Sequence, residues 1–200
     1  YTNSVTVHKN LTAKEAQALE SAIKPGMWLL VQGKMEPTWD GKDIQLNPYH
    51  IQLAEHTERQ DTAPEKRVEL HLHTKMSNMD ALTDTKEVVQ QAIRWGHPAI
   101  AITDHGVMYG VIDFYRACKA EGIKPIIGCE VYVAPRTRFD KQHEFDSEAR
   151  HLVLLCENEE GYRNLSYMVS QAFLEGFYIK PRIDLDLLRE HGSPVQWAEI

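Results

Sequence analysis

The sequence predicts an α/β domain preceded by a small β module. From Arg67 onward, apolar strand-like segments alternate with amphipathic helical segments, which is the pattern of an α/β fold. These strand-like segments are continuous apolar runs, as expected for the buried strands of a parallel sheet or an α/β barrel. Before Arg67, two strand-like stretches enclose a hairpin signal instead. A chain of 200 residues has room for one such domain and a small module.

The module before Arg67 is predicted to contain one helix and two strands. Its helix is expected over residues 11–23, and its strands over 28–35 and 43–53. Asp40 and Gly41, between the two strands, are typical of a hairpin turn. A polar run follows and is interpreted as a linker. The expected domains are therefore the β module with its leading helix at 1–60, the linker at 61–66 and the α/β domain at 67–200.

Helix caps and glycines set the expected element boundaries in the second domain. A Thr or Asp precedes the first helix, and Gly96 and Gly122 follow the first and second helices, where a left-handed C-cap is common. A polar stretch over 135–150 is predicted to be a loop. The expected strands are 68–73, 98–105, 124–134 and 151–156, and the expected helices are 83–96, 111–122 and 159–176.

Composition excludes several classes of protein. With 42% hydrophobic and 26% charged residues, the chain reads as a soluble globular protein. It has neither an apolar run of roughly 18 residues nor a signal peptide, so no membrane partner is expected. Its 3 cysteines form no CxxC pair, which favours the reducing cytoplasm. A net charge of -7 argues against a protein whose main task is to bind a phosphate backbone.

Two histidines on the first predicted strand of the second domain are candidate metal ligands. His71 and His73 are two residues apart, so on a strand both imidazoles point to the same face. The alternative is a pair of surface histidines. Asp80 follows in a polar loop and could reach the same centre, although an isolated loop aspartate is more often a helix cap or a solvated residue.

The ends of the next two strands carry further polar candidates. Asp104 and His105 end a buried strand, where α/β folds and barrels build their sites, and both are candidate catalytic residues. The alternative is that Asp104 caps the next helix. Glu130 interrupts an apolar strand, and an unpaired buried carboxylate costs several kcal/mol. A bridging metal ligand is therefore favoured over an ion pair, and Cys129 should face the core on the opposite side.

His151 precedes the last apolar strand and is a weaker candidate. The first residue of a strand lies at the end opposite to the usual site when all strands are parallel. Imidazole and carboxylate together suit zinc or manganese, and two or three such ions can activate water and neutralise a phosphate in ester hydrolysis. The predicted ligands are His71, His73, Asp80, His105, Glu130 and His151.

Four segments carry a resemblance to a known family. HLHTKMSNMDAL, AIAITDHG, IIGCEVYVAP and HLVLLCENEEGYRNL resemble the PHP (polymerase and histidinol phosphatase) domain of bacterial C-family replicative DNA polymerases. The resemblance extends from Arg67 to about Gly192. Up to about residue 106, the chain is similar to the PolC type, including a small OB-like domain before the PHP domain. After that position it is closer to the DnaE type, the alpha chain of DNA polymerase III.

The resemblance implies a PHP-type (β/α) barrel, here incomplete, behind an OB-like β module. A full barrel of this kind takes about 250 residues, and the late Asp-x-His ligand pair and the polymerase palm are absent from this sequence. The family match assigns the metal ligands named above, with Glu130 as the bridging acid. Family members hold up to three metal ions. Some hydrolyse phosphoesters or remove 3′ nucleotides, and others keep the site only as structure.

Three functions therefore stay open at this point: a metal-dependent phosphoesterase or 3′–5′ exonuclease, an inactive scaffold that stabilises a polymerase, and a single-strand-binding module. The third is the weakest, because the 7 basic and 9 acidic residues before Arg67 form no basic track. Expected partners are DNA through the parent polymerase and other replisome subunits. Self-association of the incomplete barrel through open strand edges is also expected.

Overall fold

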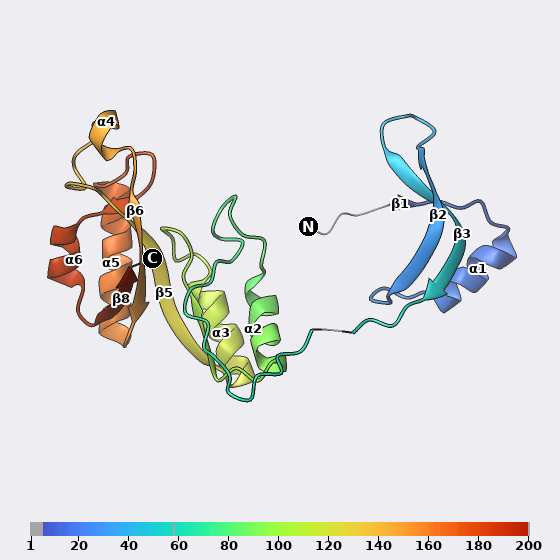
Figure 1. The fold of residues 1–200 in the computed structure, drawn as a ribbon, viewed down its shortest axis with the longest axis horizontal. Coiled ribbons are helices and arrows are strands. Elements are labelled where there is room, and N and C mark those ends of the chain that lie inside the picture. The colour runs from blue at the N-terminus through green and yellow to red at the C-terminus, as the bar shows by residue number, and fades with distance from the viewer. Residues whose placement is uncertain (1–5, 58, 200) are drawn as a thin grey trace. The chain divides into compact units, whose positions relative to one another are not determined.

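The computed structural model describes residues 6–57 and 59–199, and the chain divides into two compact units at 1–59 and 60–200 (Figure 1). We refer to them as the N-terminal and C-terminal units. Among the described residues, the model contains no helix whose length and apolarity would let it cross a membrane.

The N-terminal unit is a helix and a three-stranded sheet. Strands β2 and β3 form the predicted antiparallel hairpin, with a register shift between Gln32 and Gly33, and β1 pairs in parallel with β3. A side chain at Gly33 would come within 2.4 Å of the Asn47 carbonyl, so the bulge requires glycine there. The elements are β1 (Thr6–Val7), α1 (Ala13–Ala22), β2 (Leu29–Pro37) and β3 (Ile44–Leu53).

The sheet of the N-terminal unit is open. An OB fold is a five-stranded barrel, whereas the described residues of this unit form three strands in the order β1-β3-β2. Pro48 is the only buried residue among 6–57 and 59, and Trp28 and Leu30 on the hairpin are each 57% exposed. The OB-like assignment of this unit therefore stays a prediction.

The C-terminal unit is built on a mixed sheet, not on the parallel sheet that the apolar runs predicted. Its strand order is β4-β5-β6-β8, and β7 pairs with β5. Strand β5 is parallel to β4 and β7, but β6 is antiparallel to both β5 and β8. The strands are β4 (Ala99–Ile102), β5 (Lys124–Val133), β6 (Arg150–Cys156), β7 (Arg182–Ile183) and β8 (Val195–Glu199).

The antiparallel step has a simple cause. No long helix follows β5, and the loop at 135–150 turns the chain back so that β6 runs beside β5 in the opposite direction. The helices are α2 (Thr85–Arg94), α3 (Val111–Glu121), the one-turn α4 (His143–Asp146), α5 (Glu159–Leu174) and α6 (Leu185–His191).

The predicted strand over 68–73 is irregular in the structure. Only one bridge forms, between Glu69 and Ile100. Further along, the Leu72 amide donates to the Thr103 hydroxyl at 2.7 Å, so a side chain replaces a backbone carbonyl in the ladder. The segment at 68–73 therefore runs alongside β4 without forming a regular strand.

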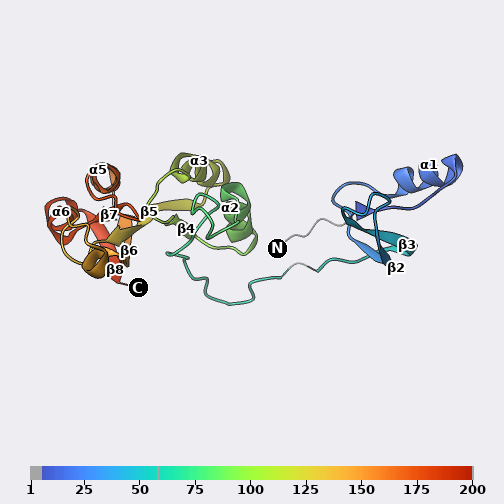
Figure 2. The same ribbon diagram turned by 90° about the horizontal axis from the view of Figure 1, so that it is seen from above.

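Two hydrophobic clusters hold the helices against the sheet. Figures 1 and 2 show α2 and α3 side by side, and one cluster joins these helices to β4. The other cluster joins β5 and β6 to α5 and α6. The helix ends follow the sequence signals: Asp84 caps α2, and Gly96 and Gly122 both have a φ of 75°.

The two faces of β5 have different chemistry. Cys129, Val131 and Val133 point into the core against α5, as predicted for Cys129, and burial raises the pKa of that thiol. Alternation along a strand places Glu130 and Tyr132 on the opposite face. The face that is not covered by α5 therefore carries the polar side chains.

A buried arginine orders the polar loop at 135–150. Arg182 is 1% exposed and donates to the carbonyls of Gly176, Asp146 and Asp140 at 3.1, 3.1 and 2.8 Å. Asp146 also accepts a hydrogen bond from Arg136 at 2.5 Å. The connection between β5 and β6 is therefore held in place from inside.

Asp146 should give this loop a measurable acid sensitivity. The Arg136 hydrogen bonds lower the pKa of Asp146 from 3.8 to about 2. Because the folded pKa is the lower one, the ionised carboxylate stabilises the fold above about pH 4, and this stabilisation is lost as the pH falls from about 4 to about 2. In Asp146→Asn, the free energy of unfolding from urea titrations should therefore fall less across this range than in wild type.

Asp186→Asn is the matched control, because its side chain is 77% exposed and pairs with Arg189 only at the surface. The control should follow the wild-type dependence on pH. Equal acid dependence in Asp146→Asn and wild type would contradict the assignment.

Candidate metal centre

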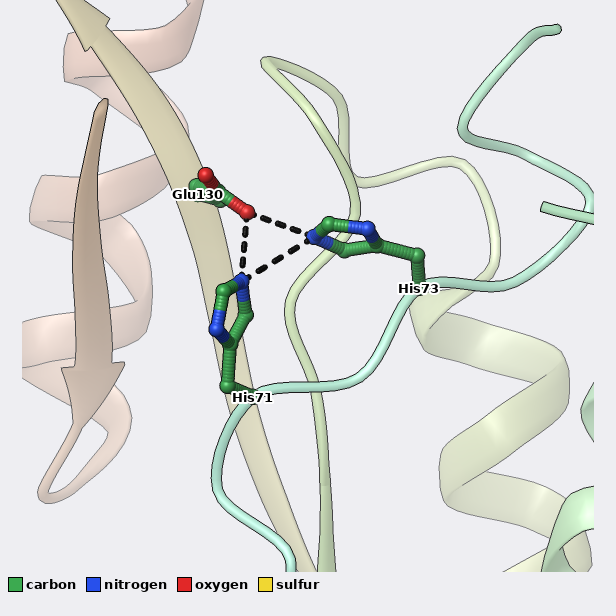
Figure 3. A group of neighbouring side chains, drawn as sticks. All are labelled: His71, His73 and Glu130. Carbon is green, nitrogen blue, oxygen red and sulfur yellow. Dashed lines mark hydrogen bonds and ion pairs between the residues drawn. The ribbon is translucent and has the colours of Figure 1, made fainter. Parts of the chain in front are cut away.

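His71 and His73 converge on one carboxylate oxygen. Their Nε2 atoms lie 2.6 and 2.5 Å from Oε2 of Glu130, and 3.2 Å from each other. Figure 3 shows both rings reaching from the irregular segment toward Glu130 on β5. The two-residue spacing thus brings both imidazoles to one point, although the segment is not a regular strand.

His105 and Asp80 extend this group. The Gly106 amide donates to the Glu130 carbonyl at 2.8 Å, which places His105 beside β5. Nε2 of His105 pairs with Oδ2 of Asp80, and Nδ1 of His105 lies 3.6 Å from Oε2 of Glu130. Asp80 also lies 3.7 Å from Nδ1 of His73. The loop after His73 therefore folds back and brings Asp80 close to His73 and His105.

His151 joins from the other side of the carboxylate. Its Nδ1 lies 2.6 Å from Oε1 of Glu130. The sequence argument placed this residue at the wrong end of a parallel sheet, but β6 is antiparallel to β5, and His151 lies opposite Tyr132 near the end of β5. The direction of β6 therefore brings the beginning of that strand, with His151, to the site. We call the six residues the histidine–acid cluster: His71, His73, Asp80, His105, Glu130 and His151.

Asp104 does not point into the histidine–acid cluster. Its carboxylate is buried and accepts hydrogen bonds from the Thr74 amide at 2.6 Å and the Ser77 hydroxyl at 2.7 Å. The same Ser77 oxygen accepts a hydrogen bond from the His105 amide at 3.1 Å. Asp104 thus holds the loop between His73 and Asp80 in place through hydrogen bonds, and the catalytic role that was predicted from its place at the end of a strand stays a prediction.

Sequence reasoning missed Thr74 and Ser77. The only local signal is that two hydroxyl residues follow the histidines in HLHTKMS. Their partner lies 30 and 27 residues further along the chain, so only the tertiary structure identifies the hydroxyls that bind Asp104.

The electrostatics of the site favour an ionised Glu130 beside a neutral His105. Burial alone would raise the pKa of Glu130, but hydrogen bonds from His71, His73 and His151 outweigh it and lower this pKa. Burial lowers the pKa of His105, and the nearby His73 and His151 add to this effect. Metal ligation requires ionised carboxylates and neutral imidazoles, and these shifts favour both forms.

The donor set fits divalent metal ions. Nδ1 of His105 is buried and has no hydrogen-bond partner among the described residues, which is unusual for a buried polar atom. Nitrogen and oxygen ligands without thiolate suit zinc or manganese. Three overlapping groups could each hold an ion: His71, His73 and Glu130; His73, Asp80 and His105; and His105, Glu130 and His151.

Comparison with known proteins identifies the family. The model of the PHP domain matches residues 69–196. The chain belongs to the PHP domain family. The match includes the whole histidine–acid cluster, so the family assignment and the geometry concern the same part of the chain.

The relatives include DNA polymerase III proteins of both the alpha-subunit type and the PolC type. DNA polymerase III subunit alpha of Chlamydia pneumoniae is 54% identical over 127 residues, which are 63% of this chain and 10% of that protein. The DNA polymerase III PolC-type protein of Pediococcus pentosaceus is 45% identical over 130 residues, 65% of this chain and 9% of that protein. The chain thus spans about a tenth of their length. The predicted resemblance to both polymerase types is confirmed over the PHP domain, and the predicted change of type at about residue 106 stays a prediction.

The similarity to solved structures is weaker than the similarity to the polymerase sequences. A Bifidobacterium adolescentis protein assigned as a metal-dependent phosphoesterase has a TM-score of 0.38 and is 21% identical. The match covers 52% of this chain and 32% of that protein.

Asp104→Asn should weaken metal binding without removing a cluster residue. The asparagine carbonyl oxygen can still accept from the Thr74 amide and the Ser77 hydroxyl, which both donate to Oδ1, but the amide group replaces Oδ2, which accepts from the Thr74 hydroxyl. The negative charge that strengthens all of these hydrogen bonds is also lost. Loss of such supporting hydrogen bonds typically costs about 10- to 100-fold in metal affinity. Titration of the metal-free protein with zinc, followed by calorimetry, measures the change.

Asp113→Asn is the control, because this exposed aspartate lies in the first turn of α3. It should bind zinc as wild type does. Wild-type affinity in Asp104→Asn would show that the loop at 74–80 does not depend on the buried carboxylate.

Proposed function

We propose that the PHP domain of this chain holds two or three divalent ions, zinc or manganese, and hydrolyses phosphodiesters. The observation that carries the proposal is the convergence on Glu130. Ligand groups from four separate parts of the chain meet there, and the ligand atoms of each group lie within 4.8 Å of one another. A buried carboxylate is costly unless other groups balance its charge, and cations held by these ligands would do so.

Three cluster residues each belong to two of the possible ligand groups, which supports binding of more than one ion. Glu130 directs Oε2 to His71 and His73, and Oε1 to His151, so its two oxygens face different histidines. His73 and His105 likewise belong to two groups each. Ions held by adjacent groups would lie close together, as in two-metal phosphoesterases, where the usual separation is about 4 Å.

The residues of the chain would then have distinct tasks. Divalent ions supply an activated water and neutralise charge on a phosphate. The cluster residues hold the ions, and Asp104 keeps the loop between His73 and Asp80 in position. His105 remains our candidate for a direct part in catalysis, because its buried Nδ1 has no hydrogen-bond partner among the described residues and its Nε2 contacts Asp80.

The similarity to polymerase segments supports a wider proposal. We place this domain in a bacterial DNA polymerase III alpha chain of the cytoplasm, where DNA reaches it through the parent polymerase and other replisome subunits are partners. In that setting the activity would be that of a 3′–5′ exonuclease.

We also propose that the N-terminal unit is OB-like. The sheet of the C-terminal unit would be part of a PHP-type barrel that closes with strands from elsewhere or by self-association.

Metal content tests the proposal most directly. Purified, dialysed wild type should contain two or more equivalents of zinc or manganese by elemental analysis. His71→Ala should lose metal, because it removes one of the two imidazoles that face Oε2 of Glu130.

His143→Ala serves as the control, since this exposed histidine of α4 lies outside the cluster. Its metal content should equal that of wild type. Unchanged metal content in His71→Ala, or no metal in wild type, would refute the proposed site.

Hydrolysis is the second test. Metal-loaded wild type should cleave bis(p-nitrophenyl) phosphate and remove nucleotides from the 3′ end of a short DNA strand. His105→Ala should lower kcat/KM by roughly 100-fold or more, as for other groups that act on the reacting atoms. If metal raises the Tm of wild type but neither substrate is cleaved, the domain acts as a structural scaffold.

A further inference from the structure

Lys180 lies at the edge of the histidine–acid cluster. Its Nζ is 5.4 Å from the ring centroid of Tyr132, which is close enough for a cation–π contact. The same ring stacks on His105 at 5.8 Å and meets His151 edge-on at 4.9 Å. A single aromatic ring therefore separates the ammonium group from two of the proposed metal ligands.

The backbone around Lys180 is held in an unusual conformation. Ile179 has a φ of 63°, which is rare and costly for a β-branched residue, and its side chain is 55% exposed. The Tyr178 amide donates to the Lys180 carbonyl at 3.0 Å across this turn. Strain of this kind persists where the surrounding structure enforces it, and it is common at functional sites.

The surroundings enforce this turn from both sides. The Arg182 guanidinium lies 5.2 Å from the Tyr178 ring centroid and is itself fixed by backbone carbonyls. On the other side, a side chain at Gly106 would come within 3.0 Å of the Tyr132 ring and 3.1 Å of Pro181. The loop after His105, the Tyr132 ring and the turn at 178–181 are thus packed closely together.

The charge of Lys180 is available to a ligand. The neighbouring arginines are occupied: Arg136 pairs with Asp146, and Arg138 pairs with Glu175 and Asp184. In the part of the chain that the structure describes, Lys180 has no carboxylate partner within 4.0 Å, and it is exposed. A lysine in this situation suits an anion that binds at the cluster, because the ammonium group is a compact point charge.

We propose that Lys180 is a substrate-binding residue that contacts the phosphate group of a nucleotide or phosphodiester bound at the histidine–acid cluster. This inference rests on the proposed function and names the residue that would bind the anionic substrate. In the structure the ammonium group lies against the Tyr132 ring, and that ring contacts His105 and His151 of the cluster. A phosphate bound at the cluster would exchange the ring contact for a charge-assisted hydrogen bond, which is the stronger interaction.

Binding of thymidine 5′-monophosphate tests the inference. The whole chain is loaded with manganese, its metal content is measured, and the Kd for the nucleotide is determined by calorimetry. Lys180→Ala should raise this Kd about tenfold or more, the usual effect of losing a hydrogen bond to a charged group. Lys180→Arg should keep most of the affinity. The KM for the p-nitrophenyl diester should rise in Lys180→Ala more than kcat falls.

Lys119→Ala is the matched control. Lys119 is an exposed lysine on α3 whose Nζ lies 5.5 Å from the Tyr115 ring, and neither residue belongs to the cluster. It should leave the Kd, the metal content and the Tm unchanged. A purely structural role for Lys180 would lower the Tm of Lys180→Ala and leave the Kd unchanged.

The outcomes separate the inference from the proposed function. If wild type takes up manganese and cleaves the diester but Lys180→Ala binds the nucleotide equally well, the inference is wrong and the proposed function stands. An equal loss of affinity in Lys119→Ala also overturns the inference, because general charge would explain it. If wild type takes up no manganese, both fail together.

Discussion

The buried carboxylate of Glu130 is the constraint on which this part of the molecule depends. A charge on the face of a β-strand with a side-chain exposure of 3% is tolerated only when other groups compensate it. Here nitrogen atoms of three histidines lie 2.5–2.6 Å from its two oxygens. His71 and His73 come from the segment before β4, and His151 comes from β6. The same concentration of nitrogen and oxygen ligands makes the site suitable for divalent cations.

The architecture around Glu130 follows from that requirement. The irregular segment before β4 carries His71 and His73, the end of β4 leads to His105, and the antiparallel direction of β6 supplies His151. Buried hydrogen bonds hold the supporting loops: Asp104 fixes the loop that returns Asp80. Side chains with packed or hydrogen-bonded supports keep a site rigid, and such rigidity is what ligand geometry needs.

A second buried charge has a comparable task at the same end of β5, where Arg182 pairs with Tyr132. Arg182 satisfies carbonyl groups of the loop that connects β5 and β6, and the turn that precedes it carries Lys180 toward the Tyr132 ring. The polar loop is therefore an ordered part of the site's surroundings. In the N-terminal unit, by contrast, few side chains are buried, and its sheet leaves apolar residues such as Trp28 exposed.

The sequence by itself determined the helices α1, α2, α3 and α5, the hairpin and the candidate ligand residues, because caps, glycines and side-chain spacing are local signals. It did not predict the short helices α4 and α6. Such local signals explain why α2 ends just before Gly96, why Cys129 is buried in the core, and why His71 and His73 converge. The antiparallel β6, the positioning role of Asp104 and the place of Lys180 were decided only by the tertiary structure. Each depends on partners that lie far away in the chain, and neither periodicity nor spacing reports which distant segments pair or in which direction.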